Sequence, residues 1–211
     1  MIFYIDTSTS FLYAALYKDE KVIDKITLNL GKELSSKALA LINEMFKKNN
    51  LEFNNIDKII AVNGPGSFTG VRVGLTIAKT IAWSINKPII TISSIEAMAL
   101  SCNDDFDYVI PIIDARRNYY YSGIFDMVNN MFVLKEQYIS YDLIMASAKS
   151  LPGKIAVVTN DSFDSNYDIE KYEPNYERII NFVKDREPID VHLVDANYLK
   201  KTEAEENRND N

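Results

Sequence analysis

The sequence predicts an α/β protein made of two related halves of unequal size, and two observations support this fold class. A strand that ends in aspartate is followed by two further strands, a helix, a strand and a helix, and this order occurs twice along the 211 residues. The first copy alone carries a glycine-rich turn, Asn63-Gly64-Pro65-Gly66-Ser67, that leads directly into a helix. The second copy is shorter, so we expect a reduced second lobe.

The first half is predicted to alternate strands and helices. Short apolar or alternating runs bounded by turn residues predict strands at 2–6, 11–17, 21–28, 58–62 and 89–92. Apolar residues at three- and four-residue steps predict helices at about 34–48, from the glycine turn to about 85, and at about 94–101. Ser67 or Thr69 is the expected N-cap of the middle helix, which ends before Asn86-Lys87-Pro88.

The second half repeats this pattern in a shorter form. Strands are predicted at 108–113, 118–125, 131–139 and 155–158, and helices at about 141–150 and 176–184. Asn103-Asp104-Asp105 is the best candidate for a linker, which divides the chain into an N-terminal lobe, 1–102, and a smaller C-terminal lobe, 103–211. The polar stretch from Lys200 to Asn211 is expected to fray.

Composition excludes several functional classes. A formal net charge of −7 argues against a free-standing nucleic-acid binder, because neutralising phosphates requires a basic surface. The single cysteine, Cys102, rules out an internal disulfide and is expected to be buried rather than nucleophilic. With His192 as the single histidine, no zinc site of the His/Cys type can be assembled, so neither a metal nor a cofactor is predicted. No apolar run is long enough to span a membrane and no basic leader opens the chain, which indicates a cytoplasmic protein.

Asp6 and Asp114 each end the first strand of their half, and strand ends that face a crevice are where α/β folds bind ligands. Two carboxylates across such a cleft could hold Mg²⁺ on a nucleotide. Alternatively, each aspartate caps its own turn. The glycine turn lacks the lysine of a P-loop and is a weak phosphate cradle. The resulting candidate for a vestigial nucleotide or anion site consists of Asp6, Thr7, Ser8, Gly64, Gly66, Ser67, Asp114 and Arg116.

Two predicted helices carry faces suited to packing against another helix. Small residues at four-residue steps after the glycine turn would allow close approach, either of a partner helix or of the chain's own sheet. The apolar stripe of the helix at 34–48 is widened by Leu39 and Phe46, so part of it is expected to face a partner. An arginine at Gly74 or Ala78 would then break the complex and leave the fold intact. The candidate docking residues are Leu34, Ala38, Leu41, Ile42, Met45, Gly70, Val71, Arg72, Gly74, Leu75, Ala78 and Ala82.

Other polar and aromatic residues permit more than one interpretation. Arg72, Arg116 and Arg117 could bind an anion, although arginines at the ends of elements are more often solvated or paired with carboxylates. Tyr119-Tyr120-Tyr121 alternates on a predicted strand, where strand propensity explains it better than base stacking. His192 is not expected to be catalytic.

Several segments together resemble the TsaB (YeaZ) family. In family order they are Ile5-Asp6-Thr7-Ser8-Thr9, the run GPGSFTGVRVG at 64–74, Ile113-Asp114-Ala115-Arg116 and Tyr198-Leu199-Lys200. The run at 64–74 is highly specific, and the other segments support it in combination. Together they span nearly the whole chain.

The resemblance implies an actin/Hsp70-like (ASKHA, RNase H-like) fold of two α/β lobes, the second one reduced. It also implies a non-catalytic subunit that supports the catalytic paralogue TsaD, together with the ATPase TsaE, in forming N6-threonylcarbamoyladenosine (t6A) in tRNA. In the family the first two helices dock against TsaD or a second TsaB copy, and here they correspond to about Leu34–Lys48 and Gly70–Ile85. A homodimer is therefore expected without the partner, with tRNA contacted only through the complex and no membrane contact.

The sequence also departs from the family pattern. Leu34 stands where many relatives have a histidine, and the metal-binding histidine pair of the catalytic paralogue is missing from this helix, which favours a non-catalytic role. In the family an acidic residue follows the Asp-Ala-Arg turn, which is 114–116 here, and this residue is replaced near Tyr119. The family motif Pro-x-Tyr-Leu-Arg is replaced by the segment 196–200, ANYLK. These changes weaken an inherited anion-binding role. The alternative is an ASKHA-type nucleotide-binding phosphotransferase or ATPase that uses Asp6 and Asp114 with Mg²⁺.

Overall fold

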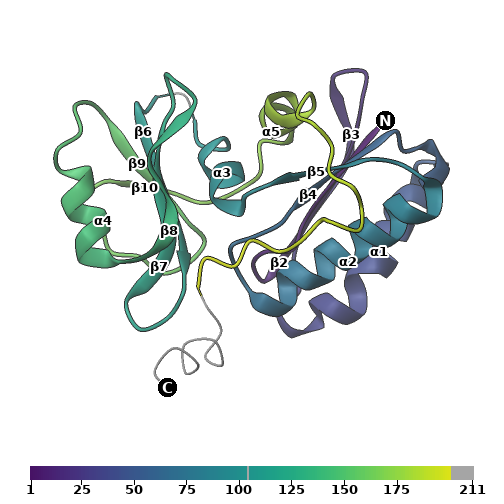
Figure 1. The fold of residues 1–211 in the computed structure, drawn as a ribbon, viewed down its shortest axis with the longest axis horizontal. Coiled ribbons are helices and arrows are strands. Elements are labelled where there is room, and N and C mark those ends of the chain that lie inside the picture. The colour runs from purple at the N-terminus through teal and green to yellow at the C-terminus, as the bar shows by residue number, and fades with distance from the viewer. Residues whose placement is uncertain (104, 201–211) are drawn as a thin grey trace.

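The computed structural model describes residues 1–103 and 105–200, so the predicted fraying of the tail falls almost entirely outside the described residues. Two five-stranded mixed sheets stand next to each other, with helices outside and between them (Figure 1). The strand orders are β3-β2-β1-β4-β5 and β10-β9-β6-β7-β8. In each sheet an antiparallel three-stranded meander continues into two parallel strands. The predicted two-lobe α/β class is therefore confirmed.

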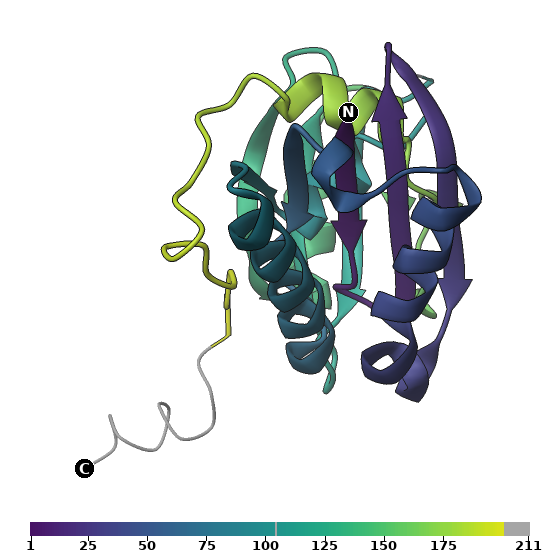
Figure 2. The ribbon, with the colours of Figure 1, turned by 90° about the vertical axis from the view of Figure 1, so that its right-hand side faces the viewer.

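The first sheet carries two long helices on its outer face (Figure 2). Along β1, Phe3 and Ile5 point into the core beneath these helices, whereas Tyr4 points to the opposite face, as the two-residue period of a strand requires. The elements of this layer are β1 (Ile2–Asp6), β2 (Phe11–Lys18), β3 (Lys21–Asn29), α1 (Leu34–Lys48), β4 (Lys58–Val62), α2 (Phe68–Ile85) and β5 (Ile89–Ile92), with short 3₁₀ turns at Gly31–Glu33 and Phe53–Asn55.

The ends of α2 follow from its sequence. The Ser67 hydroxyl accepts a hydrogen bond from the Gly70 N–H at 3.2 Å, so Ser67 is the N-cap, one of the two predicted. At the other end Asn86 adopts a left-handed conformation with φ of 51°, and Pro88 follows two residues later. The helix therefore ends where the sequence predicts.

The second sheet carries one helix on its outer face, and its elements are β6 (Tyr108–Asp114), β7 (Tyr119–Asp126), β8 (Met131–Ser140), α4 (Tyr141–Ala148), β9 (Ile155–Val158) and β10 (Asp168–Glu170). The sequence did not predict β10. Because β10 follows β9 with no helix between them, this lobe has no counterpart of α2 within the described residues. The helix predicted at 176–184 therefore corresponds to the last helix of the first half.

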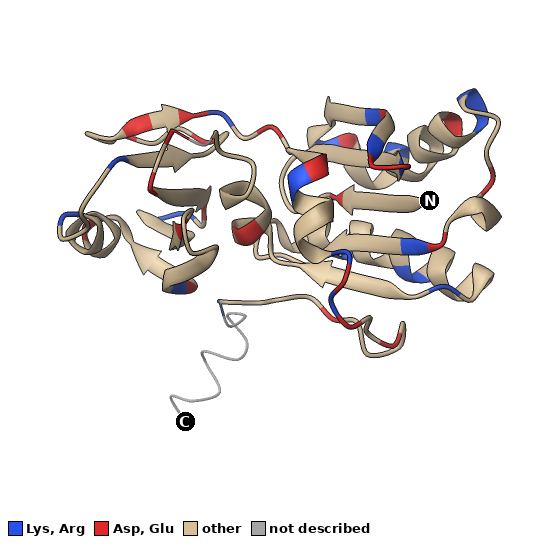
Figure 3. Ribbon diagram, turned by 90° about the horizontal axis from the view of Figure 1, so that it is seen from above, with Lys and Arg blue, Asp and Glu red and all other residues tan. Residues whose placement is uncertain are grey.

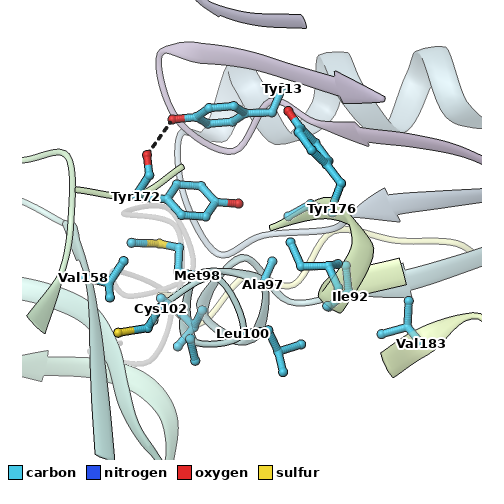
Figure 4. Packing of buried hydrophobic residues seen from close by; sticks show 14 of the residues in the cluster. Tyr13, Ile92, Ala97, Met98, Leu100, Cys102, Val158, Tyr172, Tyr176 and Val183 are labelled. Atoms are coloured by element: carbon cyan, nitrogen blue, oxygen red, sulfur yellow. Dashed lines mark hydrogen bonds between the residues drawn. The ribbon is translucent and has the colours of Figure 1, made fainter. Parts of the chain in front are cut away.

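Two short helices, α3 (Ser94–Ala99) and α5 (Tyr176–Val183), lie in the layer between the sheets, and each ends one or two residues before its predicted end. Figure 4 shows the core around them, with Met98 and Leu100 packed among side chains of both lobes. Cys102 is buried there as predicted, and burial raises the pKa of its thiol to about 12, which disfavours the nucleophilic thiolate.

After α5 the chain returns to the first lobe, and we call residues 184–200 the strap (yellow in Figure 1). The N–H of Ile189 donates to the carbonyl of Ile89 at 2.8 Å, and the Lys79 ammonium donates to the carbonyl of Val194 at 2.7 Å. Val194 is buried in the core beneath α1 and α2. The division of the chain into lobes between residues 102 and 103 stays a prediction. The strap, which that division assigns to the second lobe, packs on the first lobe.

Candidate functional site

A cleft of about 830 Å³ opens between the lobes, where β1 and β6 end. Its walls come from the loop after β1, the glycine turn, the start of α2 and the turn after β6. Of the predicted vestigial site, the structure brings five residues to this cleft: Ser8, Gly66, Ser67, Asp114 and Arg116. The other three predicted residues, Asp6, Thr7 and Gly64, do not line it.

The carboxylate of Asp6 is fully buried, and both of its oxygens already accept hydrogen bonds. The N–H of Ser8 donates to Oδ1 at 2.7 Å, and the hydroxyl of Tyr172 donates to Oδ2 at 3.3 Å. The ring of Tyr172 packs edge-on against Tyr13 with centres 5.2 Å apart (Figure 4). Burial raises the pKa of the Asp6 carboxyl. Asp6 thus caps its own turn and is covered by an aromatic ring.

Asp114 is exposed at the cleft and also organises a turn. Its Oδ1 accepts the Arg116 N–H at 2.8 Å, and its own N–H donates to Asp161 Oδ2 at 2.8 Å. Arg116, Arg117 and Asn118 all adopt left-handed conformations, with φ of 70°, 57° and 61°. Each of the two aspartates therefore caps its own turn, which is the alternative to a shared Mg²⁺ site. Within residues 1–103 and 105–200 no group of three His, Cys, Asp or Glu side chains is placed to hold a metal ion.

The glycines of α2 allow the helix to approach the loop after β1. A methyl group at Gly70 would overlap the carbonyl oxygen of Thr7, and one at Gly74 would overlap the Thr7 hydroxyl. That hydroxyl donates to the Gly70 carbonyl at 2.7 Å. The small-residue face of α2 therefore packs on the chain's own first sheet and on the loop after β1, and not on a partner helix.

This geometry corrects the placement of most candidate docking residues. Leu41 is half-buried and Arg72 is exposed, but the others are buried within the first lobe, and of these only Leu34 and Gly70 also line the interlobe cleft. Because Gly74 abuts the Thr7 hydroxyl and Ala78 is fully buried, we now expect arginine at either position to disrupt the core rather than leave the fold intact. The buried candidates are Leu34, Ala38, Ile42, Met45, Gly70, Val71, Gly74, Leu75, Ala78 and Ala82.

The same helices also carry exposed apolar side chains, of which the sequence analysis named Leu39 and missed Phe68 and Trp83. Leu39 on α1 is 52% exposed, and Phe68 and Trp83 on α2 are 46% and 67% exposed. The two charged residues of α2, Arg72 and Lys79, are both basic. Over the rest of the two lobes, acidic and basic residues are interspersed (Figure 3). The sequence did indicate that Trp83 would be exposed, because it lies on a different side of the helix from the stripe of small residues from Gly70 to Ala82 that faces the sheet.

The buried carboxyl group predicts how stability depends on pH. Because the pKa of Asp6 is raised in the folded protein above its unfolded value of about 3.9, the folded chain holds a proton that the unfolded chain releases. The free energy of unfolding should therefore fall as pH rises from about 4 through the folded pKa. Asp6→Asn removes this titration, and its amide can still accept from Ser8. Urea unfolding at a series of pH values should show the two proteins diverging as pH rises, in favour of the variant; parallel curves would contradict the assignment.

The fold and the interlobe cleft define a two-lobe α/β protein of the actin/Hsp70-like class, and comparisons place it more closely. The family model described as TsaD, tRNA N6-adenosine threonylcarbamoyltransferase, matches residues 25–176. The chain belongs to this family, in the branch of TsaB (YeaZ) proteins.

Individual relatives cover almost the whole chain. The tRNA threonylcarbamoyladenosine biosynthesis protein TsaB of Bacillus subtilis is 29% identical over 95% of this chain and 94% of its own length. The protein of the same name from Buchnera aphidicola of Acyrthosiphon pisum is 24% identical over 87% and 88%. YeaZ from Pseudomonas aeruginosa superimposes with a TM-score of 0.79 at 18% identity, over 94% of this chain and 99% of that one, which supports the fold.

No helix in the described residues is long and apolar enough to cross a membrane. The cytoplasmic location expected from the composition stays a prediction.

Proposed function

We propose that the chain is a non-catalytic subunit in the biosynthesis of tRNA threonylcarbamoyladenosine, and that it supports a homologous catalytic subunit by docking on it. The names of its relatives support the pathway. The catalytic partner is TsaD, the ATPase TsaE completes the system, and a homodimer forms when TsaD is absent. The covered carboxylate of Asp6 supports the non-catalytic role, since the alternative phosphotransferase needs that group open to Mg²⁺ and nucleotide.

The observation that carries the docking role is the exposed outer face of α1 and α2. We call Leu39 and Trp83 the outer-face residues. Tryptophan is enriched among the residues that contribute most to binding, and Trp83 is the most exposed large apolar side chain of the two helices. The inner faces of both helices are already buried in the chain's own core, so a partner would contact the outer face.

Arginine at the outer face should prevent assembly. Leu39→Arg and Trp83→Arg place a charge in the proposed interface, and each should weaken the complex about 30-fold or more. Light scattering of the chain alone and mixed with the TsaD of its organism would measure the mass, with t6A formation assayed in the same samples. The matched control is Leu143→Arg on α4, which is 60% exposed on the second lobe and should leave assembly unchanged.

Two results would contradict the proposal. One is a complex that survives both outer-face substitutions, which would place docking elsewhere. The other is ATP hydrolysis by the purified chain alone that Asp6→Asn abolishes, which would restore the enzyme alternative.

A further inference from the structure

Beside the interlobe cleft lie aromatic rings that the proposed docking face does not use, and one of them, Tyr121, lines the cleft. On β7 and β8, Tyr119 stacks on Tyr138 with ring centres 4.7 Å apart and planes 10° apart. Tyr121 pairs with Tyr138 in the strand register, and their ring centres are 5.9 Å apart. Tyr119 and Tyr121 project to one face of the sheet because they are two residues apart on a strand. We call these three side chains the tyrosine platform.

One cation contacts the tyrosine platform, and two more lie in the turn that precedes it in the chain. The ammonium of Lys200 lies 5.2 Å from the ring centre of Tyr138. Arg116 and Arg117 are exposed in the turn that leads into β7, and neither guanidinium has an acidic partner within the described residues. Positive charge therefore gathers locally on a chain of net charge −7.

On the first lobe, Phe68 lines the cleft, and a cation and a second ring pack beside it. The guanidinium carbon of Arg72 lies 3.7 Å from the ring centre of Phe68, and Arg72 Nε donates to the hydroxyl of Tyr198 at 2.8 Å. Phe68 and Tyr198 are 46% and 42% exposed, so both rings keep accessible surface. The cleft of about 830 Å³ is thus lined by Phe68 from the first lobe and by Tyr121, Arg116 and Lys200 opposite it. Ligand pockets of such volume accommodate small molecules or single nucleotides.

One exposed ring, Tyr119, and two half-buried rings on neighbouring strands, with arginines nearby that lack acidic partners within the described residues, match the chemistry of single-stranded nucleic acid. Bases stack on the rings, and arginine or lysine contacts the phosphates. Tyr119 is 40% exposed, so a base could extend the existing Tyr119–Tyr138 stack. The acidic residues lining the cleft, Asp114 and Asp161, would keep phosphates at the rim.

We propose that the tyrosine platform and its flanking arginines bind a single-stranded RNA loop, with a base stacked on Tyr119 and phosphates held by Arg116 and Arg117. The choice of RNA rests on the proposed role in tRNA modification. Such binding goes beyond the indirect contact with tRNA expected from the family resemblance. The net negative charge of the whole chain still makes the affinity modest, because the basic region is small.

The test measures fluorescence anisotropy of a labelled RNA hairpin with a single-stranded loop, and of the fully paired stem, with the full chain and with its complex. Tyr119→Ala should weaken hairpin binding about tenfold, whereas Tyr119→Phe keeps the ring and should bind like the parent. Each alanine at Arg116 or Arg117 should lower the slope of log affinity against log salt by about 0.7. Lys135→Ala and Val133→Ala, both exposed on β8, are the matched controls.

Each outcome decides the proposal. Equal binding of hairpin and stem, or Tyr119→Ala binding like the parent, overturns it. If Tyr119→Ala leaves RNA binding unchanged but releases the partner protein, the surface docks protein and the proposal fails. Light scattering of the same samples keeps the two hypotheses separate. A chain that forms no complex yet binds the hairpin through Tyr119 refutes the docking role and supports the RNA surface.

Discussion

Gly70→Ala should destabilise the folded chain by about 2 kcal/mol, although alanine is the better helix former. The added methyl group would overlap the backbone carbonyl of Thr7, which cannot rotate away as a side chain would. Either α2 or the loop after β1 must move, and the hydrogen bond from the Thr7 hydroxyl to the Gly70 carbonyl would be strained. Urea unfolding followed by circular dichroism would measure the loss as a lower midpoint.

Gly31→Asn is the matched control for this substitution. A methyl group at Gly31 meets no atom within 4 Å, and its φ of 49° is a left-handed conformation that asparagine tolerates. We expect less than about 1 kcal/mol of change there. An equal loss at both positions would show that the close approach of α2 to Thr7 contributes nothing to stability.

Tyr172→Ala should have the largest effect on stability, about 3–5 kcal/mol, because it removes a buried ring from the layer between the lobes. It would also remove the hydroxyl that donates to Asp6, leaving that carboxylate with fewer hydrogen bonds in a buried site. Hydrogen exchange should rise in α3 and α5, which share this layer. Thermal unfolding with hydrogen exchange measured by mass spectrometry would record both changes.

Tyr172→Phe separates the ring from the hydroxyl. It keeps the packing against Tyr13 and loses only the hydrogen bond to Asp6, so we expect about 1–2 kcal/mol. If the alanine variant were no less stable than the phenylalanine variant, the ring would not hold the two lobes together.

Local patterns predicted most of the elements, because each depends on a few neighbouring residues. The N-cap at Ser67 and the stop before Pro88 are of this kind. The strand Asp168–Glu170 was missed because three polar and apolar residues carry too little periodicity, and its pairing with β9 stabilises it instead. Element ends shifted by one or two residues, as capping and fraying lead one to expect.

The site was harder to predict, because its geometry joins residues far apart in sequence. Asp6 could be named from its place after the first strand, but its cover by Tyr172, 166 residues later, leaves no local signal. The glycine stripe was correctly seen as a close-packing face, but composition could not tell a partner helix from the chain's own loop at Thr7. The sequence pattern indicates which face of a helix is buried, but not whether the chain's own core or a partner covers that face.

The strap also bears on how the chain is made. Its contacts join Ile189 to Ile89 and Val194 to Lys79, so part of the first lobe is completed by residues that leave the ribosome late. Until then the place of Val194 beneath α1 and α2 stays empty, and the apolar residues around it remain open to water. The early lobe can therefore reach its final packing only after the second lobe has been synthesised.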